Sequence, residues 1–366
     1  MHIWRNCYIS GSEARKIMCK SEAKMKQCGK GGRREKRFWR SGRGMAMLLL
    51  IVLAAMAFSL RFGSSRFSSA DFWSGLLGRE GYETQSAILR YIRLPRILGA
   101  VLAGIGLSVS GVLLQSVTAN PLASPSIIGV NSGAGFFAIL CLSFLPGALY
   151  ALPFAAFLGA FGATLLILAV AKRLGSTPAT VVLAGIALTA LLNAGISFLS
   201  LLNDDVLLAY HDFSVGGLAG TQLQGLAAPG TIILLSLAVS IMASRQIQLL
   251  CLGDAMALSL GVRVKALRML CLLCASAAAS AVVSFAGLLG FVGLVVPHIA
   301  RKLVGENAKF LLLSSALFGA ALVLLADLLG RVLLAPAEVP VGIIMAVLGA
   351  PFFFALLLKK RGEGAC

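Results

Sequence analysis

Long apolar runs, separated by short stretches with charge, proline or glycine, constrain this chain more than any other feature. Residues 93–135 show the pattern: a basic start, an apolar run, a break at Asn120, Pro121 and Pro125, and a second run from Gly129. An apolar run of about 20 residues spans a bilayer as a helix. Each proline removes a backbone donor and restricts the residue before it. The stretch therefore predicts two membrane helices joined by a turn.

Small residues recur every four positions in the first of these runs, at Ala100, Gly104 and Ser108. Residues at this spacing lie on one face of a helix. Small side chains let a second helix approach closely, which is how helices associate in lipid. This face predicts close packing against another membrane helix.

The composition excludes an ordinary soluble domain. Hydrophobic residues make up 58% of the chain, charged residues only 13%, and the mean hydropathy is +0.92; soluble domains are about 25% charged. The sequence thus predicts an all-α polytopic membrane protein. The apolar runs give about ten spans, near 45–62, 96–117, 127–145, 150–171, 179–202, 229–245, 266–286, 288–302, 310–333 and 340–358.

The net charge of +18 is concentrated in residues 1–44, which hold thirteen of the 32 basic residues. This distribution indicates a basic cytoplasmic tail that is solvated or bound to lipid headgroups, and argues against a nucleic-acid partner. Because Met45 stands directly before the first apolar run, we hypothesise that translation starts downstream of Met1. The intact mass of the purified protein tests this.

The remaining basic residues predict the orientation. With the N-terminus inside, twelve of them fall in inner segments and seven in outer ones, which satisfies the positive-inside rule. Both termini are therefore expected to be cytoplasmic in a multi-pass membrane protein. Residues 361–366 form a short cytoplasmic C-terminal tail.

Three ordered motifs carry a family resemblance. The series RLPR, SGVLLQ and NPLASPSIIGVNSGA is followed by LGDAMALSLGV, and then by GLLGFVGLVVPHIAR with LADLLGRVLLAPAEVPVGIIMAVLGAPFFFALL. From about residue 62 to 360, this order resembles the FecCD-type permeases, the membrane subunits of binding-protein-dependent ABC importers for iron-siderophore complexes, heme and cobalamin. The resemblance implies one permease domain over residues 45–360, with type II ABC importer architecture and an inverted repeat of helices two to five and seven to ten.

The resemblance implies that Arg93, Arg96 and Arg331 dock an extracytoplasmic substrate-binding protein. The planar guanidinium of arginine binds carboxylates bidentately, so outward arginines suit an acidic partner. Two alternatives stay open: the arginines snorkel to lipid headgroups, or Arg331 forms a local helical pair with Asp327, four residues earlier.

The resemblance also implies that residues 252–262 couple the membrane domain to an ABC ATP-binding subunit. The residues assigned to this role are Gly253, Asp254, Ala257, Leu260 and Gly261. The segment is helix-forming and ends at a glycine, so a short amphipathic helix could fill a groove on a soluble partner. The alternative is a helix that lies on the bilayer surface.

The other motif residues are assigned structural or pathway roles. They are Gln115, Asn120, Pro121, Pro125, Gly129, Pro297, His298, Arg301, Glu338 and Pro340. His298 could serve as a proton relay or heme ligand, but its place at a helix end near Arg301 favours a structural role. The resemblance puts an inner gate near residues 175–178.

No motif indicates catalysis or a resident metal. The acids and histidine at Asp204, Asp205, His211 and Asp212 give only a weak metal signal in an expected outer loop. The pair Cys271 and Cys274 is interpreted as packing.

A phosphate-binding G-x-x-x-x-G-K-[ST] loop does not occur in the sequence. The prediction is a non-catalytic subunit with no cofactor of its own, whose ATP is bound by a partner. It would pair with a second permease subunit, identical or paralogous, within the membrane lipids. A ferric siderophore is the favoured cargo, with heme and cobalamin open; a secondary transporter, a channel and an exporter are the rival classes.

Overall fold

The computed structural model describes residues 42–363 except 66, 146, 175–177 and 203. In this part of the chain the regular elements are helices. Each of the ten predicted segments falls on one: α2 (Gly42–Arg61), α5 (Leu94–Thr118), α6 (Val130–Phe144), α7 (Leu152–Leu174), α8 (Pro178–Ser200), α10 (Leu223–Met242), α13 (Val264–Ala286), α14 (Val292–Val304), α15 (Ala308–Leu333) and α16 (Val341–Glu363).

Seven of the described helices are long and apolar enough to cross a membrane: α2, α4–η1–α5 as one run, α7, α8, α10, α13 and α15. The other three predicted segments are shorter. Helix α6 has 15 residues and α14 has 13, and the apolar part of α16 that the structure describes covers Val341–Ala355.

Shorter helices join the long ones. They are α3 (Ser69–Leu76), α4 (Glu83–Ala87), η1 (Ile88–Arg93), η2 (Pro125–Ile128), η3 (Leu149–Ala151), α9 (Asp204–Val215), α11 (Ser244–Leu250) and α12 (Asp254–Ser259). The expected outer loop at 202–228 is wrong, because it contains α9 and the first turns of α10. Helix α10 runs through Pro229, since membrane helices tolerate an internal proline whose freed backbone group finds another partner.

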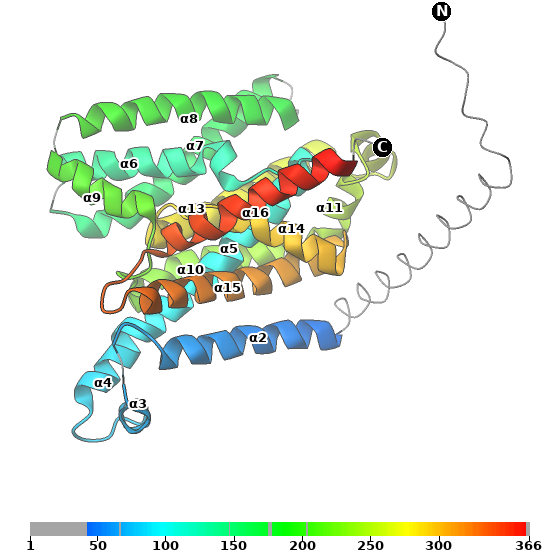
Figure 1. The fold of residues 1–366 in the computed structure, drawn as a ribbon. Coiled ribbons are helices and arrows are strands. Elements are labelled where there is room, and N and C mark those ends of the chain that lie inside the picture. The colour runs from blue at the N-terminus through cyan, green and yellow to red at the C-terminus, as the bar shows by residue number, and fades with distance from the viewer. Residues whose placement is uncertain (1–41, 66, 146, 175–177, 203, 364–366) are drawn as a thin grey trace, which may run out of the picture.

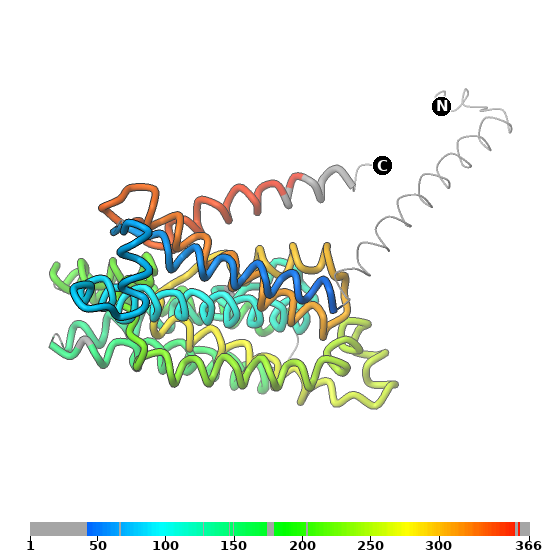
Figure 2. Tube along the Cα trace, turned by 90° about the horizontal axis from the view of Figure 1, so that it is seen from below, coloured from blue at the N-terminus to red at the C-terminus, as the bar shows by residue number. Residues whose placement is uncertain are grey.

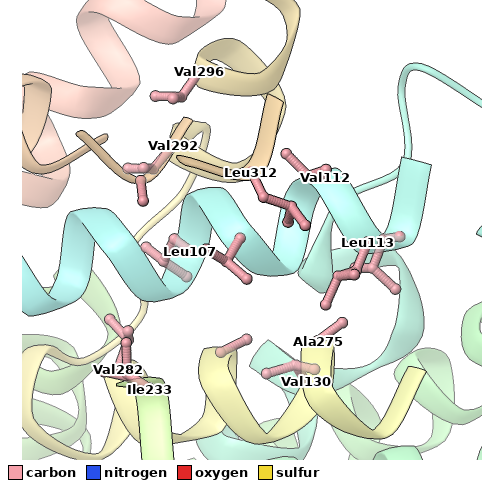
Figure 3. Packing of buried hydrophobic residues seen from close by; sticks show 14 of the residues in the cluster. Leu107, Val112, Leu113, Val130, Ile233, Ala275, Val282, Val292, Val296 and Leu312 are labelled. Atoms are coloured by element: carbon pink, nitrogen blue, oxygen red, sulfur yellow. The ribbon is translucent and has the colours of Figure 1, made fainter. Parts of the chain in front are cut away.

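Helix α5 lies at the centre of the bundle, with 78% of its most apolar window buried. It packs against α13, α14 and α15, and Figure 3 shows the side chains that fill this contact. Leu107, Val112 and Leu113 of α5 lie between Val282 and Ala275 of α13 on one side and Leu312 of α15 on the other. By contrast, the corresponding windows of α2 and α8 are only 28% and 11% buried.

Glycines set the spacing of the central helices. A Cβ at Gly104 of α5 would lie 2.2 Å from the backbone oxygen of Gly319 in α15, and one at Gly111 would lie 1.9 Å from that of Gly293 in α14. Ser108 of α5 also lies against Gly319, because a Cβ added at Gly319 would be 2.0 Å from Oγ of Ser108. The predicted small-residue face is thus confirmed as a close helix contact.

The packing partners repeat between the two halves of the bundle. Helix α5 packs on α15 and α14, and α13 packs correspondingly on α7 and α6; the pairs α6–α7 and α7–α8 correspond to α14–α15 and α15–α16. Since α5 and α13 enter the bundle from opposite ends, this is the contact pattern that an inverted repeat requires.

The bundle has two distinct ends (Figures 1 and 2). Helix α11, the start of α2 and the last described turns of α16 lie together at what we name the basic end. Helices α3, α4 and α9 and the loop after α15 lie at the opposite end, which we name the outer end. The predicted tail lies outside the described residues except for residues 42–44, which begin α2.

Candidate functional site

An ion cluster at the outer end joins α5, α15 and the loop that follows α15. Arg96 places Nε 2.9 Å from Oδ1 of Asp327 and Nη1 2.5 Å from Oε2 of Glu338. Arg331 places Nε 3.0 Å from Oδ2 of the same aspartate. The Asp327 side chain is fully buried, and its two oxygens each face a guanidinium. One carboxylate therefore holds together segments that are more than 200 residues apart.

Two arginines of this region also donate hydrogen bonds to the C-terminal end of α2. Arg93 donates to the backbone oxygens of Leu60 at 2.6 Å and Arg61 at 3.0 Å, and to that of Ser65 at 2.6 Å. Arg331 donates to the backbone oxygen and the hydroxyl of Ser59. The last carbonyls of a helix lack partners within the helix, and cations suit its negative C-terminal end. The cluster thus anchors α2 to the bundle.

The structure brings the three predicted docking residues together but buries them. Arg93, Arg96 and Arg331 are 3%, 5% and 2% exposed. The local pair with Asp327 is present, and snorkelling does not describe side chains enclosed by protein. In this arrangement the guanidinium groups are occupied by groups of the same chain, so the docking role stays a prediction.

Glu338 is the one acid of the cluster outside a helix, in the loop between α15 and α16. Partial burial opposes its ionisation, but the hydrogen bond from Arg96 and the positive charges of Arg96 and Arg331 outweigh it and lower the pKa of this carboxyl. The carboxylate is therefore the favoured form. Its side chain is 29% exposed, which makes it the most accessible anion in the cluster.

The second site lies at the basic end, where α11 and α12 connect α10 to α13. The predicted short helix is present as α12, and it starts and stops at glycines with positive φ: 103° at Gly253 and 81° at Gly261. Only glycine adopts such angles readily. Asp254 accepts from Arg268 of α13 at 2.9 Å, and Ala257 is fully buried. The helix is thus fixed to the bundle by one face.

The other face of α12 is apolar and exposed. Met256, Leu258 and Leu260 are 53%, 60% and 54% exposed. A short helix that is anchored on one side and apolar on the other can insert into a groove of a partner. The assigned residues therefore divide: Gly253, Asp254, Ala257 and Gly261 shape and hold the helix, and Leu260 belongs to its exposed face.

Two motif residues from distant segments meet near this end. Gln115 of α5 accepts from Nη1 of Arg301 at 3.0 Å and donates to the backbone oxygen of Gly293 at 3.4 Å. Both line a cavity of about 310 Å³ beside Cys251. Desolvation by the surrounding atoms raises the pKa of the Cys251 thiol. The pair ties α5 to α14 at the basic end.

Most of the remaining motif residues shape turns. Asn120 accepts from the backbone of Leu122 at 3.0 Å, which makes a local turn. Pro125 begins η2, and Gly129 ends it with a φ of 72°. Pro121 lies in the turn between α5 and η2.

Pro340 accepts from the backbone of Ile343 in the first turn of α16. Pro297 lies inside α14, and the adjacent His298 stacks edge-on against Phe352 at 5.9 Å between ring centroids. The structural role predicted for His298 fits this contact.

The weak metal signals do not form a site in the part of the chain that is described. No group of three or more His, Cys, Asp or Glu side chains there could hold a metal ion. Asp204, Asp205, His211 and Asp212 are spread along α9. Cys271 is a buried packing residue of α13. Residues 175–177 of the predicted inner gate lie outside the described residues.

The sequence did not identify three partners that complete these sites: Ser59 for Arg331, Arg268 for Asp254, and Arg301 for Gln115. Each pair joins different helices. Pairing of charged or polar types was a signal available in the sequence, but the sequence does not show which helices pack together.

The fold and the two sites define an all-helical membrane protein in which an ion cluster fixes one end and a short exposed helix projects at the other. The chain belongs to the FecCD transport family, whose model matches residues 49–359.

Two relatives and one solved structure show the extent of the similarity. The chain is 38% identical to the Fe(3+)-citrate import system permease protein YfmE of Bacillus subtilis, over 85% of this chain and 93% of that protein. It is 36% identical to the hemin transport system permease protein HmuU of Yersinia pestis, over 87% and 97%. A solved inward-facing conformation of a metal-chelate type ABC transporter matches with a TM-score of 0.79 and 31% identity, over 87% of this chain and all of that one.

Proposed function

We propose that this chain is the permease subunit of a binding-protein-dependent ABC importer that carries an iron(III) chelate across the bacterial cytoplasmic membrane. The observation that carries the proposal is α12, whose exposed face presents Met256, Leu258 and Leu260 while its other face is fixed to α13. Such a helix suits a groove in a soluble ATP-binding subunit. The chain carries no phosphate-binding loop sequence, so ATP hydrolysis is assigned to that partner and no catalysis to this chain.

The basic end is assigned to the cytoplasm. Basic residues cluster there at the end of α7, in α11, at the start of α13 and at the end of α14, as the positive-inside rule requires. The outer end then faces the substrate-binding protein. Docking through Arg93, Arg96 and Arg331 would need acidic groups of that protein to replace Asp327 or Glu338, and Glu338 is the accessible one.

The weakly buried face of α8 supports pairing with a second permease subunit. Only 11% of its most apolar window is buried within one chain, and close helix packing in lipid would cover it. The partner is a second copy or a paralogue. A central pathway between two such subunits would open to either side as nucleotide binding moves α12.

The proposed cargo is inferred from the names of the relatives. An iron(III) chelate is the proposal because the Fe(3+)-citrate permease YfmE matches over most of its length; heme, which the HmuU name indicates, and cobalamin are the alternatives. A secondary transporter is disfavoured on geometry. A proton-coupled carrier needs an embedded carboxylate that can exchange protons, whereas Asp327 is held between two guanidinium groups.

Reconstitution tests the proposal. Vesicles that contain this chain, the ATP-binding subunit and the binding protein should take up ferric citrate only with ATP, and vesicles with this chain alone should take up none. Met256→Glu should abolish copurification of the ATP-binding subunit. Leu208→Glu is the matched control, because Leu208 is 70% exposed on α9 at the outer end.

Two results would revise the proposal differently. Sustained uphill uptake by the chain alone would overturn the importer assignment. ATP-dependent uptake of hemin or cobalamin, with none of ferric citrate, would change the cargo and leave the subunit assignment intact.

A further inference from the structure

An apolar surface that the transport function does not use lies on the segment between α2 and α5. Trp73, Leu76 and Leu77 of α3 and its C-cap are 60%, 41% and 67% exposed. Spacings of three and four residues put these side chains on one face of the helix. The opposite face is packed, with Phe72 buried and Gly75 so close to Gln85 of α4 that an added Cβ would lie 2.8 Å from the Cβ of that residue.

The segment has a fixed position relative to the membrane. Arg61, the last residue of α2, donates to the backbone oxygen of Phe67 at 3.0 Å and to the hydroxyl of Ser69 at 3.2 Å. Its guanidinium also lies over the ring of Phe72, 5.3 Å from the centroid. Ser68 and Asp71 form a capping box that starts α3 at this point. Helix α3 is thus held within a few residues of the outer end of a membrane span.

Figures 1 and 2 show where this places α3 and α4. The two helices lie beyond the end of α2 and project to the side of the bundle, past the face that α2 presents outward. Helix α2 exposes apolar side chains that include Leu50, Leu53 and Phe58, which are 67%, 55% and 58% exposed. In a span with so little of its surface buried, these side chains contact lipid. Helix α3 begins close to the outer end of this span, where Arg61 donates to Ser69.

The charges on the segment favour lipid over an acidic protein as the partner of this surface. Arg79 and Arg90 are exposed there, and so are Glu80 and Glu83. A surface for an acidic protein would carry an excess of arginine. Nearly balanced charge beside tryptophan and leucine is instead typical of the membrane–water interface, where tryptophan is enriched because its ring is amphipathic.

We propose that α3 lies in the headgroup region of the outer leaflet, with Trp73, Leu76 and Leu77 inserted among the lipids, and that it acts as an interfacial foot beside α2. Short amphipathic helices bind the interface by burying their apolar face at the boundary of headgroups and acyl chains. The foot would fix the depth and tilt of α2, to which the ion cluster of Arg93 and Arg331 is bound. This inference does not depend on the cargo or on the ATP-binding partner.

The sequence offers a direct probe, since the chain has three tryptophans, and Trp4 and Trp39 lie in the basic tail. The full-length Trp4→Phe/Trp39→Phe variant leaves Trp73 as the sole tryptophan. It is reconstituted into phosphatidylcholine vesicles whose acyl chains are brominated near the headgroup or near the chain end. We expect a blue-shifted emission relative to tryptophan in water, and several-fold stronger quenching by the shallow bromines than by the deep ones.

Two control variants calibrate depth. In the background that also carries Trp73→Phe, Leu50→Trp reports an exposed position near the middle of α2 and should be quenched by deeper bromines. Met256→Trp reports a position at the basic end and should show weak quenching.

Water-like emission of Trp73 without quenching would overturn the proposal. So would water-like emission that turns blue only when the substrate-binding protein is added, because that result would assign the surface to a protein partner. Emission that depends on the protein-to-lipid ratio would assign it to a second copy and would equally overturn the lipid interface.

Discussion

Asp327→Asn should be the most destabilising conservative substitution in the ion cluster. The change keeps the shape of the side chain but removes the charge that faces Arg96 at 2.9 Å and Arg331 at 3.0 Å. All three side chains are at most 7% exposed, so water cannot replace the lost partner. Removing one member of a buried ion pair costs about 3–5 kcal/mol, because it leaves an uncompensated charge.

Glu338→Gln provides the contrast within the same cluster. Its side chain is 29% exposed, so solvent screens its interaction with Arg96 and the loss should be about 1 kcal/mol or less. Adding Arg331→Met to Asp327→Asn should recover part of the lost stability, since it removes the guanidinium whose ion pair is lost with Asp327, whereas Arg96 keeps its pair with Glu338.

The assay is reversible unfolding of the purified protein in mixed detergent micelles, followed by helix content. Asp212→Asn, which changes an exposed carboxylate of α9, is the control and should match the wild type. Equal losses for Asp327→Asn and Glu338→Gln would refute the argument that burial decides the contribution of each acid. A more severe loss in the double variant than in Asp327→Asn alone would show that the hydrogen bonds from Arg331 to Ser59 outweigh the uncompensated charge.

Three further results are expected. Gly319→Ala should lower unfolding stability by about 1–3 kcal/mol, because its Cβ would lie 2.0 Å from Oγ of Ser108, whereas Gly162→Ala in α7, with nothing within 4 Å, should not; equal effects would contradict close packing. The folded pKa of Glu338 lies below the ordinary value of 4.5. Its contribution to stability should therefore be full above pH 4.5 and should be lost as the pH falls through the lower folded pKa. If the difference in melting temperature between the wild type and Glu338→Gln widens on acidification, this reasoning is refuted. Asp254→Asn should reduce substrate uptake per ATP hydrolysed in the reconstituted complex, because it frees α12 from α13, and an unchanged ratio would argue against that anchor.

The sequence by itself determined the membrane class and the ten helical segments. Runs of apolar residues specify helices locally, since a backbone in lipid must satisfy its own hydrogen bonds. It also indicated where α12 stops, because glycine adopts the positive φ angle found at Gly261 without a steric cost. The face at Gly104 was readable for the same reason: spacing along one helix is a local property.

Only the tertiary structure decided what the charged residues contact. Arg96 and Glu338 lie 242 positions apart and meet because α5 packs against α15. An outward docking surface and an enclosed ion cluster contain the same residue types. Only burial distinguishes them, and Arg96, at 5% exposure, is buried. The sequence also did not reveal the projecting position of α3. The apolar face of an eight-residue helix looks the same in sequence whether a protein core or a lipid surface covers it. Burial depends on segments distant in the chain, and for that physical reason it is not a property of any one stretch of sequence.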